Sequence, residues 1–62
     1  MPLVEITVVE GRDAPTLRRL ISEVSHAVAS SVGAPLGDVR VIIREVPSTH
    51  WAAGDTTIQE RE

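Results

Sequence analysis

Apolar and polar residues alternate close to the start of the chain. Within Leu3–Val9, the side chains of Val4, Ile6 and Val8 occupy every second position, and polar residues interrupt the other face. A period of two is typical of a β-strand with one buried face. The pattern therefore predicts a first strand over Leu3–Val9, followed by a turn at residues 10–13.

The apolar spacing then changes to steps of three and four over Ala14–Val32, which predicts an amphipathic helix. Asp13 is the expected N-cap, and Pro15 fits the first helical turn. Gly33 suits the position after the helix, and Pro35 prevents its continuation. The expected apolar stripe consists of Leu17, Leu20, Ile21, Val24, Val28 and Val32.

A second apolar segment at residues 39–46 predicts a strand that ends at Pro47. It is apolar on both faces, as in a strand covered on two sides. A strand, a helix and a strand in this order predict an α/β (α+β) fold, namely one βαβ unit with parallel strands and a right-handed crossover. A short hairpin is expected within residues 50–55, and residues 56–62 read as a polar tail. Residues 1–62 form a single expected domain.

The length of the chain changes this picture, because 62 residues provide little core. A domain of this size buries only about 60% of the surface that its unfolded chain exposes. The sequence has no cysteine, and its two histidines lie at unrelated positions, so neither a disulfide nor a metal site is expected to stabilise it. Two parallel strands also leave open sheet edges. We therefore expect edge-to-edge dimers that stack into a larger closed assembly; the alternative is a marginal monomer.

Charge and hydropathy exclude several classes of partner. The net charge of −3 argues against a nucleic-acid partner, which requires a clustered basic face. No apolar run approaches the length of a membrane span, and the N-terminus has no basic region of a secretory signal. The sequence thus predicts a cytoplasmic protein without nucleic-acid or membrane partners.

Pro2 is the first candidate for chemistry. Removal of Met1 would turn it into an N-terminal secondary amine, and an apolar pocket or nearby cations would lower the pKa of that amine. An unprotonated amine of this kind can act as a general base at neutral pH. The alternative interpretation is that Pro2 merely begins the strand.

Two arginines and the single aromatic residue are the other candidates. Arg12 follows the first strand, and Arg40 lies within the second, between two valines. Each could bind a carboxylate through the planar guanidinium fork; the alternatives are a solvated loop side chain for Arg12 and an interfacial ion pair for Arg40. Trp51 either fills a subunit interface or forms the wall of a binding pocket. His50 reads as an exposed loop residue.

These positions and their spacing resemble the 4-oxalocrotonate tautomerase family of the tautomerase superfamily. Pro2 directly follows Met1, and the segment ITVVEGR ending at Arg12 is similar to the first strand and turn of the family. The resemblance continues with the sequence APL at residues 34–36 and VRVII at residues 39–43. It ends with the pair His50-Trp51, followed by Gly54, which is similar to the late aromatic residue and hairpin of the family. It covers nearly the whole chain.

The resemblance implies a βαβ subunit assembled as a hexamer, a trimer of dimers, and a cofactor-free isomerase. In that family, Pro2 would take a proton from a 2-hydroxydienoate such as 2-hydroxymuconate and return it at carbon. Arg40 would hold the carboxylate and polarise the adjacent oxygen, Arg12 would bind the distal carboxylate, and Trp51 would form the apolar wall. These residues come from several subunits. The implied setting is the catabolism of aromatic compounds or a biosynthetic cluster.

The sequence also departs from the family. Trp51 stands where phenylalanine is usual, and Asp55 replaces the usual second glycine of the hairpin. Relatives that dehalogenate have an arginine and a glutamate in the regions where this chain has Val9 and Ala53, which favours tautomerisation. The alternative function is a non-catalytic assembly subunit or the partner subunit of a hetero-hexamer, so that either a homo-hexamer or a hetero-hexamer is expected.

Overall fold

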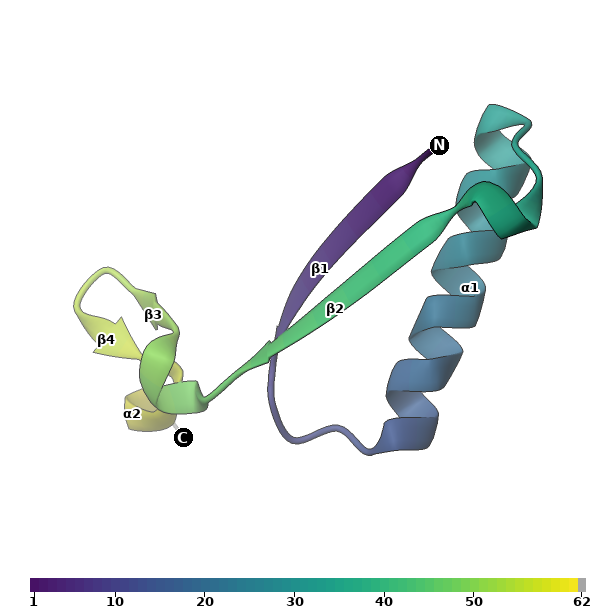
Figure 1. Ribbon diagram of the computed structural model, residues 1–62. Coiled ribbons are helices and arrows are strands. Elements are labelled where there is room, and N and C mark those ends of the chain that lie inside the picture. The colour runs from purple at the N-terminus through teal and green to yellow at the C-terminus, as the bar shows by residue number, and fades with distance from the viewer. Residues whose placement is uncertain (62) are drawn as a thin grey trace.

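A computed structural model describes residues 1–61. It contains the expected βαβ unit, formed by β1 (Leu3–Val9), α1 (Ala14–Val32) and β2 (Arg40–Val46). Figure 1 shows the two strands side by side with α1 along one side of them. The first strand and the helix have the predicted bounds. The second strand begins one residue later than expected, because the backbone N–H of Val39 instead donates to the carbonyl oxygen of Leu36 (3.1 Å), which closes the short 3-10 helix η1 (Leu36–Asp38).

Both ends of α1 have the capping groups that the sequence predicted. The carboxylate of Asp13 accepts a hydrogen bond from the backbone N–H of Thr16 (3.0 Å). The hydroxyl of Thr16, followed by its backbone N–H, lowers the pKa of the Asp13 carboxyl. At the other end, Gly33 adopts a left-handed conformation with φ +70°, and the backbone N–H groups of Gly33 and Ala34 donate to the carbonyl oxygen of Ala29. These caps satisfy backbone groups that a helix end otherwise leaves unpaired.

The strands are parallel and in continuous register, from Leu3 opposite Arg40 to Val9 opposite Val46. One face of this sheet lies against α1 and carries half-buried apolar residues, namely Val4, Ile6, Val8, Val41 and Ile43. The other face is uncovered in the protomer. Its exposed residues are Leu3, Glu5, Thr7, Arg40, Ile42 and Arg44, and the half-buried Val9 and Val46 lie at its far end.

The expectation that the second strand is covered on both faces is therefore wrong for a single protomer. Ile42 keeps 42% of its surface exposed, because the unit has one helix and that helix covers one face. Among residues 1–61 the core consists of Val39, at 9% exposure.

The segment after Pro47 forms a small arm at the end of β2, and its hairpin begins within the expected range. Its strands pair in antiparallel register, with Ala53 opposite Thr56 and Gly54 in the turn at φ +62°. The interpretation of residues 56–62 as a polar tail is wrong over the described part, because residues 56–61 form β4 and α2 and the backbone N–H of Ile58 donates to the carbonyl oxygen of Trp51 (2.8 Å). Residue 62 lies outside the described residues. The elements of the arm are η2 (Ser48–His50), β3 (Ala52–Ala53), β4 (Thr56–Thr57) and α2 (Ile58–Arg61).

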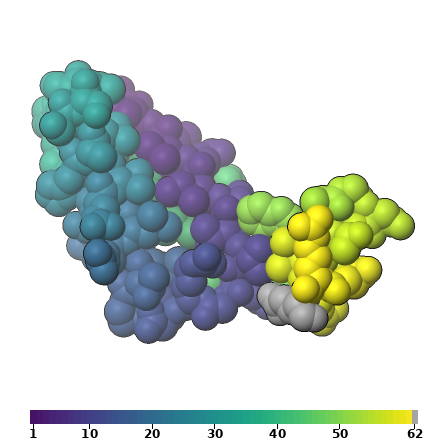
Figure 2. All heavy atoms as spheres, turned by 180° about the vertical axis from the view of Figure 1, so that it is seen from behind, coloured from purple at the N-terminus to yellow at the C-terminus, as the bar shows by residue number. Residues whose placement is uncertain are grey.

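The protomer as a whole is extended rather than spherical. Its radius of gyration is 14.5 Å, whereas a compact chain of this length has about 11 Å. It exposes 4509 Å², whereas a compact monomer of this mass exposes about 3,900 Å². Figure 2 shows the arm projecting from one end of the βαβ body. This open shape agrees with the small core that the chain length predicted.

Candidate active site

Pro2 and Arg40 are neighbours at one end of the sheet. The backbone N–H of Arg40 donates to the carbonyl oxygen of Pro2 (2.9 Å), which extends the ladder one residue beyond β1. Pro2 is half-buried, whereas Met1 is 82% exposed. The nitrogen of Pro2 is part of a peptide bond as long as Met1 is attached, so it becomes basic only in the chain that begins at residue 2.

The guanidinium of Arg40 lies on the uncovered face of the sheet. Its Nη1 donates to the carbonyl oxygen of Gly37 (2.7 Å), and this contact fixes the side chain over the turn that precedes β2. A guanidinium has five N–H donors, and within residues 1–61 the guanidinium of Arg40 has this carbonyl as its hydrogen-bond partner. The other N–H donors of the guanidinium are therefore available to a ligand.

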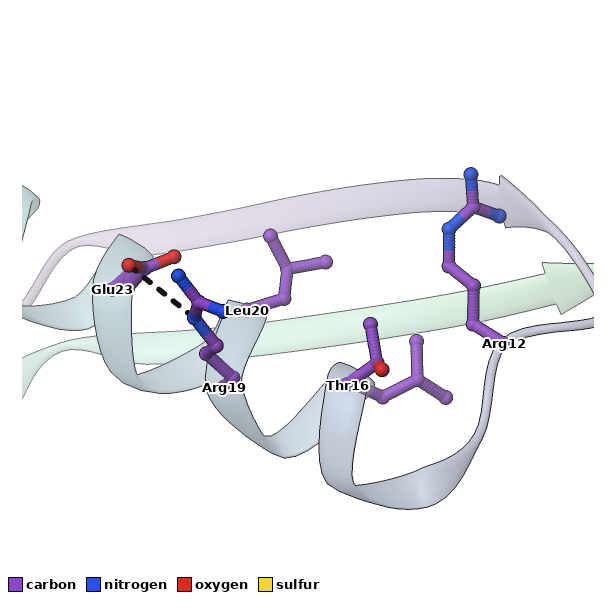
Figure 3. Close-up of a pocket in the computed structure, with 6 residues that line it drawn as sticks. Arg12, Thr16, Arg19, Leu20 and Glu23 are labelled. Carbon is purple, nitrogen blue, oxygen red and sulfur yellow. Dashed lines mark ion pairs between the residues drawn. The ribbon is translucent and has the colours of Figure 1, made fainter.

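Arg12 lies at the opposite end of β1. Its Nη1 donates to the carbonyl oxygen of Val9 (2.9 Å), and its side chain borders an open hollow of about 250 Å³ along the first turns of α1. Figure 3 shows Arg12 at one end of this hollow and the ion pair of Arg19 with Glu23 (3.6 Å) at the other. The hollow is lined by Arg12, Thr16, Leu17, Arg19, Leu20 and Glu23.

Trp51 belongs to the arm. Its carbonyl oxygen accepts a hydrogen bond from the backbone N–H of Ile58 (2.8 Å), so the start of α2 holds the loop in place. Trp51 is 37% exposed and can contact a surface of another molecule. His50 beside it is exposed, and its Nδ1 lies 2.8 Å from the hydroxyl oxygen of Thr49.

The structure thus divides the four expected site residues into two groups. Pro2 and Arg40 lie together, whereas Arg12 and Trp51 follow the other ends of β1 and β2. β1 is seven residues long, which is about 20 Å of extended chain. One protomer therefore keeps the candidate residues in two separate groups, one at each end of its sheet; if they are functional, each group is a partial site.

The structure contains two ion pairs that were not predicted from the sequence. Arg19 and Glu23 have the i, i+4 spacing of a helical ion pair, so the sequence contains a signal for them. Glu5 and Arg44 pair across the strands at 3.4 Å, and only the register of the sheet reveals that contact.

Within residues 1–61, no group of three or more acidic, histidine or cysteine side chains is placed to hold a metal ion. None of the described helices is both long and apolar enough to cross a bilayer.

A family model described as tautomerase enzyme matches residues 2–61, which is nearly the entire chain. The chain belongs to the tautomerase family. It is an isomerase, and the resemblance to the 4-oxalocrotonate tautomerases is confirmed.

The similarity extends over most of the length of individual relatives. The 2-hydroxymuconate tautomerase of Stutzerimonas stutzeri is 46% identical over 54 residues, which are 87% of this chain and 86% of the relative. A chain of the heterohexamer 4-oxalocrotonate tautomerase from Chloroflexus aurantiacus superposes with a TM-score of 0.94 over 100% of both chains, at 40% identity. A 4-oxalocrotonate tautomerase homologue of the tomaymycin biosynthetic pathway gives a TM-score of 0.94 at 33% identity, covering 97% of this chain and 92% of the other.

Proposed function

We propose that this tautomerase interconverts the enol and keto forms of 2-hydroxydienoates similar to 2-hydroxymuconate, with the amine of Pro2 as the general base. The nitrogen accepts the proton of the 2-hydroxyl group, and the electron pair of the O–H bond forms the carbonyl. The shifted dienol electrons then take the proton back from the proline at a carbon atom. Protons and electrons balance within the substrate and this amine, so the mechanism uses no cofactor.

In this mechanism Arg40 provides electrostatic stabilisation. The hydrogen bond between its backbone N–H and the carbonyl oxygen of Pro2 is the observation that supports the proposal, because it brings the backbone of Arg40 beside the residue proposed as the base. A cation in that position holds the substrate carboxylate and stabilises the charge that develops on the 2-oxygen. Arg12 would bind a second, distal carboxylate, and Trp51 would form an apolar wall around the amine.

The complete site requires more than one protomer. Pro2 and Arg40 lie at one end of the sheet, and Arg12 and Trp51 lie beyond the other. When two protomers associate with their sheets in opposite directions, Pro2 and Arg40 of one chain come close to Arg12 and Trp51 of its neighbour. The open shape of the protomer and its small core support such an assembly, and we expect a homo-hexamer formed as a trimer of dimers, acting on a small dienol carboxylate.

A second function is favoured by one observation. The chain superposes over its full length on a subunit of a heterohexamer. The chain would then be the non-catalytic partner or assembly subunit in a hetero-hexamer of the same fold.

An assay of the mature protein, with one control protein, distinguishes the two proposed functions. Intact mass establishes whether Met1 has been removed, and ultraviolet absorbance follows the ketonisation of 2-hydroxymuconate. The control is the same chain with one additional N-terminal residue, which keeps the nitrogen of Pro2 in a peptide bond. We expect the mature protein to accelerate ketonisation and the control to lack this activity. A mature chain that is inactive alone, and active only with a second chain of this fold, would establish the partner subunit instead.

A further inference from the structure

A second open hollow lies along α1 and has a volume of about 210 Å³. It shares no residue with the hollow beside Arg12, and none of its residues belongs to the candidate active site. The chain folds back after the helix (Figure 1), so that η1 contributes Leu36 to one wall. The lining combines a cation, an imidazole, two hydroxyl groups and two aliphatic side chains, without a carboxylate among the described residues. These residues are Arg18, Ile21, Ser22, Ser25, His26 and Leu36.

Arg18 provides the positive charge of this hollow. Within residues 1–61 its guanidinium forms neither an ion pair nor a hydrogen bond, whereas the neighbouring Arg19 is paired with Glu23. A guanidinium without a protein partner keeps all five N–H donors for a ligand. Its planar fork fits the two oxygens of a carboxylate through parallel hydrogen bonds. The cation of the hollow is therefore available to an organic anion.

The polar side chains of α1 determine where that anion is held. Ser22 and His26 follow Arg18 by four and eight residues, so the three side chains lie along one face of the helix. The Nδ1 of His26 donates to the carbonyl oxygen of Ser22 (2.7 Å), which leaves Nε2 free. The hydroxyl of Ser25 donates to the carbonyl oxygen of Ile21 (2.6 Å). The half-buried Ser22 is thus the residue whose hydroxyl can donate to a carboxylate beside Arg18.

The remaining lining of the hollow is apolar. Ile21 is half-buried, and Leu36 keeps 46% of its surface exposed. A hydrocarbon chain placed over these two side chains removes apolar surface from water, which is favourable in proportion to the area covered. The hollow therefore favours an organic acid over an inorganic anion.

A phosphate group fits this position less well than a carboxylate does. Phosphate groups are commonly bound by the free backbone N–H groups at a helix N-terminus. The hollow instead lies along the interior of α1 (Ala14–Val32), where each backbone N–H is bonded to the carbonyl oxygen four residues earlier. Side chains alone must bind the anion here, and they offer one guanidinium, one free hydroxyl and one imidazole.

We propose that this hollow is a second binding site, separate from the candidate active site, and that its ligand is a small aliphatic carboxylate. The carboxylate lies against Arg18 and the hydroxyl of Ser22, and the hydrocarbon chain lies over Ile21 and Leu36. Binding at this site is independent of whether Pro2 is the base. An open hollow leaves much of its ligand in water and binds weakly, so the site stays empty at the low substrate concentrations of a kinetic assay.

Calorimetric titration of the full chain with sodium butanoate, at constant ionic strength, tests the proposal. We expect saturable binding that is several-fold tighter than that of acetate, because butanoate has additional CH₂ groups to place over Ile21 and Leu36. Amide NMR shifts should locate butanoate at residues 18–26 and at Leu36. Arg18→Gln should weaken binding at least tenfold while the circular dichroism spectrum stays unchanged. Absence of saturable binding, or shifts confined to the surroundings of Arg40, would overturn the proposal.

Arg19→Gln is the matched control for Arg18→Gln. It changes the net charge by the same amount on the same helix, but Arg19 lines the other hollow. Arg40→Ala tests whether butanoate binds at the candidate active site instead. Both variants should bind butanoate with wild-type affinity, and an equal loss in either one would overturn the proposal. Inorganic phosphate should bind more weakly than butanoate, and the reverse order would overturn the assignment of the ligand as a carboxylate.

Discussion

The backbone N–H of Arg40 donates a hydrogen bond to the carbonyl oxygen of Pro2 at 2.9 Å. This bond belongs to the parallel ladder that continues with Leu3 opposite Arg40. The position of Pro2 relative to Arg40 is therefore set by the sheet and not by a loop. Residues on regular elements keep their geometry better than loop residues do, which would suit the base and the cation of the proposed mechanism.

Replacing Pro2 tests the proposed base. We expect Pro2→Ala to lower kcat/KM for 2-hydroxymuconate by about 10²-fold or more, the range in which general-base catalysis contributes. The measurement is the rate of ketonisation, made after intact mass has established that Met1 is absent from both proteins. The far-ultraviolet circular dichroism spectrum of the variant should match that of the wild type. Wild-type rates in this variant would refute the role of the proline.

The two candidate arginines should differ in their kinetic effect. Arg40→Ala removes a cation that acts on developing charge, so we expect kcat to fall by about 10²–10³-fold. Arg12→Ala removes a contact to a distal carboxylate that is present in both ground and transition states, so KM for a dicarboxylate should rise with kcat largely retained. Steady-state kinetics separate the two effects.

A monocarboxylate dienol and a distant arginine provide the controls for this comparison. KM for the monocarboxylate should be the same in Arg12→Ala and in the wild type, since that substrate has no second carboxylate. Arg18→Ala changes an exposed arginine of α1 and should leave both constants unchanged. If Arg12→Ala has an unchanged KM for the dicarboxylate as well, Arg12 does not bind the substrate.

The N-cap of α1 predicts an acid-dependent loss of stability. The pKa of Asp13 lies below its ordinary value of 3.8 in the folded chain, chiefly because of the hydroxyl and N–H of Thr16. A lowered pKa means that the folded state binds this proton less readily than the unfolded state does. Its contribution is complete above the unfolded pKa and is lost as the pH falls through the folded value.

Asp13→Asn is the matched variant, because asparagine caps a helix about as well as aspartate and does not titrate in this range. Thermal unfolding followed by circular dichroism from pH 6 to pH 2.5 provides the measurement. The advantage of the wild type over Asp13→Asn should shrink once the pH is below 4. A constant difference across this range would contradict the assignment.

We expect a substitution of Gly33 to destabilise the protein through the backbone conformation of this residue. Its φ of +70° is unfavourable for a residue with a Cβ, although a Cβ placed there would meet no atom within 4 Å. Gly33→Ala should therefore lower the free energy of unfolding by about 1–2 kcal/mol through backbone strain alone. Gly37→Ala is the control, since Gly37 also has open space but no positive φ. Urea unfolding at a fixed protein concentration should place Gly37→Ala near the wild type, and equal losses would exclude backbone strain as the cause.

The elements that the sequence predicts well are those with local signals. Asp13 and Gly33 define the ends of α1 through hydrogen bonds to residues within one turn. The start of the arm helix had such a signal too, because Thr57 and Glu60 have the spacing of a capping box. In the structure the backbone N–H of Glu60 donates to the Thr57 hydroxyl oxygen (3.2 Å), and that hydroxyl donates to the Glu60 carboxylate (2.9 Å). The polarity of residues 56–62 by itself does not indicate this capping box.

The remaining features depend on contacts between distant residues. The strands of the arm hairpin have two residues each, which is too short for any periodicity, so only the pairing of Ala52 with Thr57 defines them. The adjacency of Pro2 and Arg40 likewise follows from the register of the sheet. Individual candidates for the site can be named from the sequence, but their division between the two ends of β1 requires the fold.

The opposite placement of the two partial sites has a genetic consequence. Under the proposed function, a chain with a defective Pro2 still donates an intact Arg12 and Trp51 to a neighbour's site, and a chain with a defective Arg12 still donates Pro2 and Arg40. Two differently damaged copies can thus complement each other inside one oligomer. After gene duplication, either copy can lose one half without abolishing activity, so a shared site offers a direct route from one gene to a pair of interdependent genes.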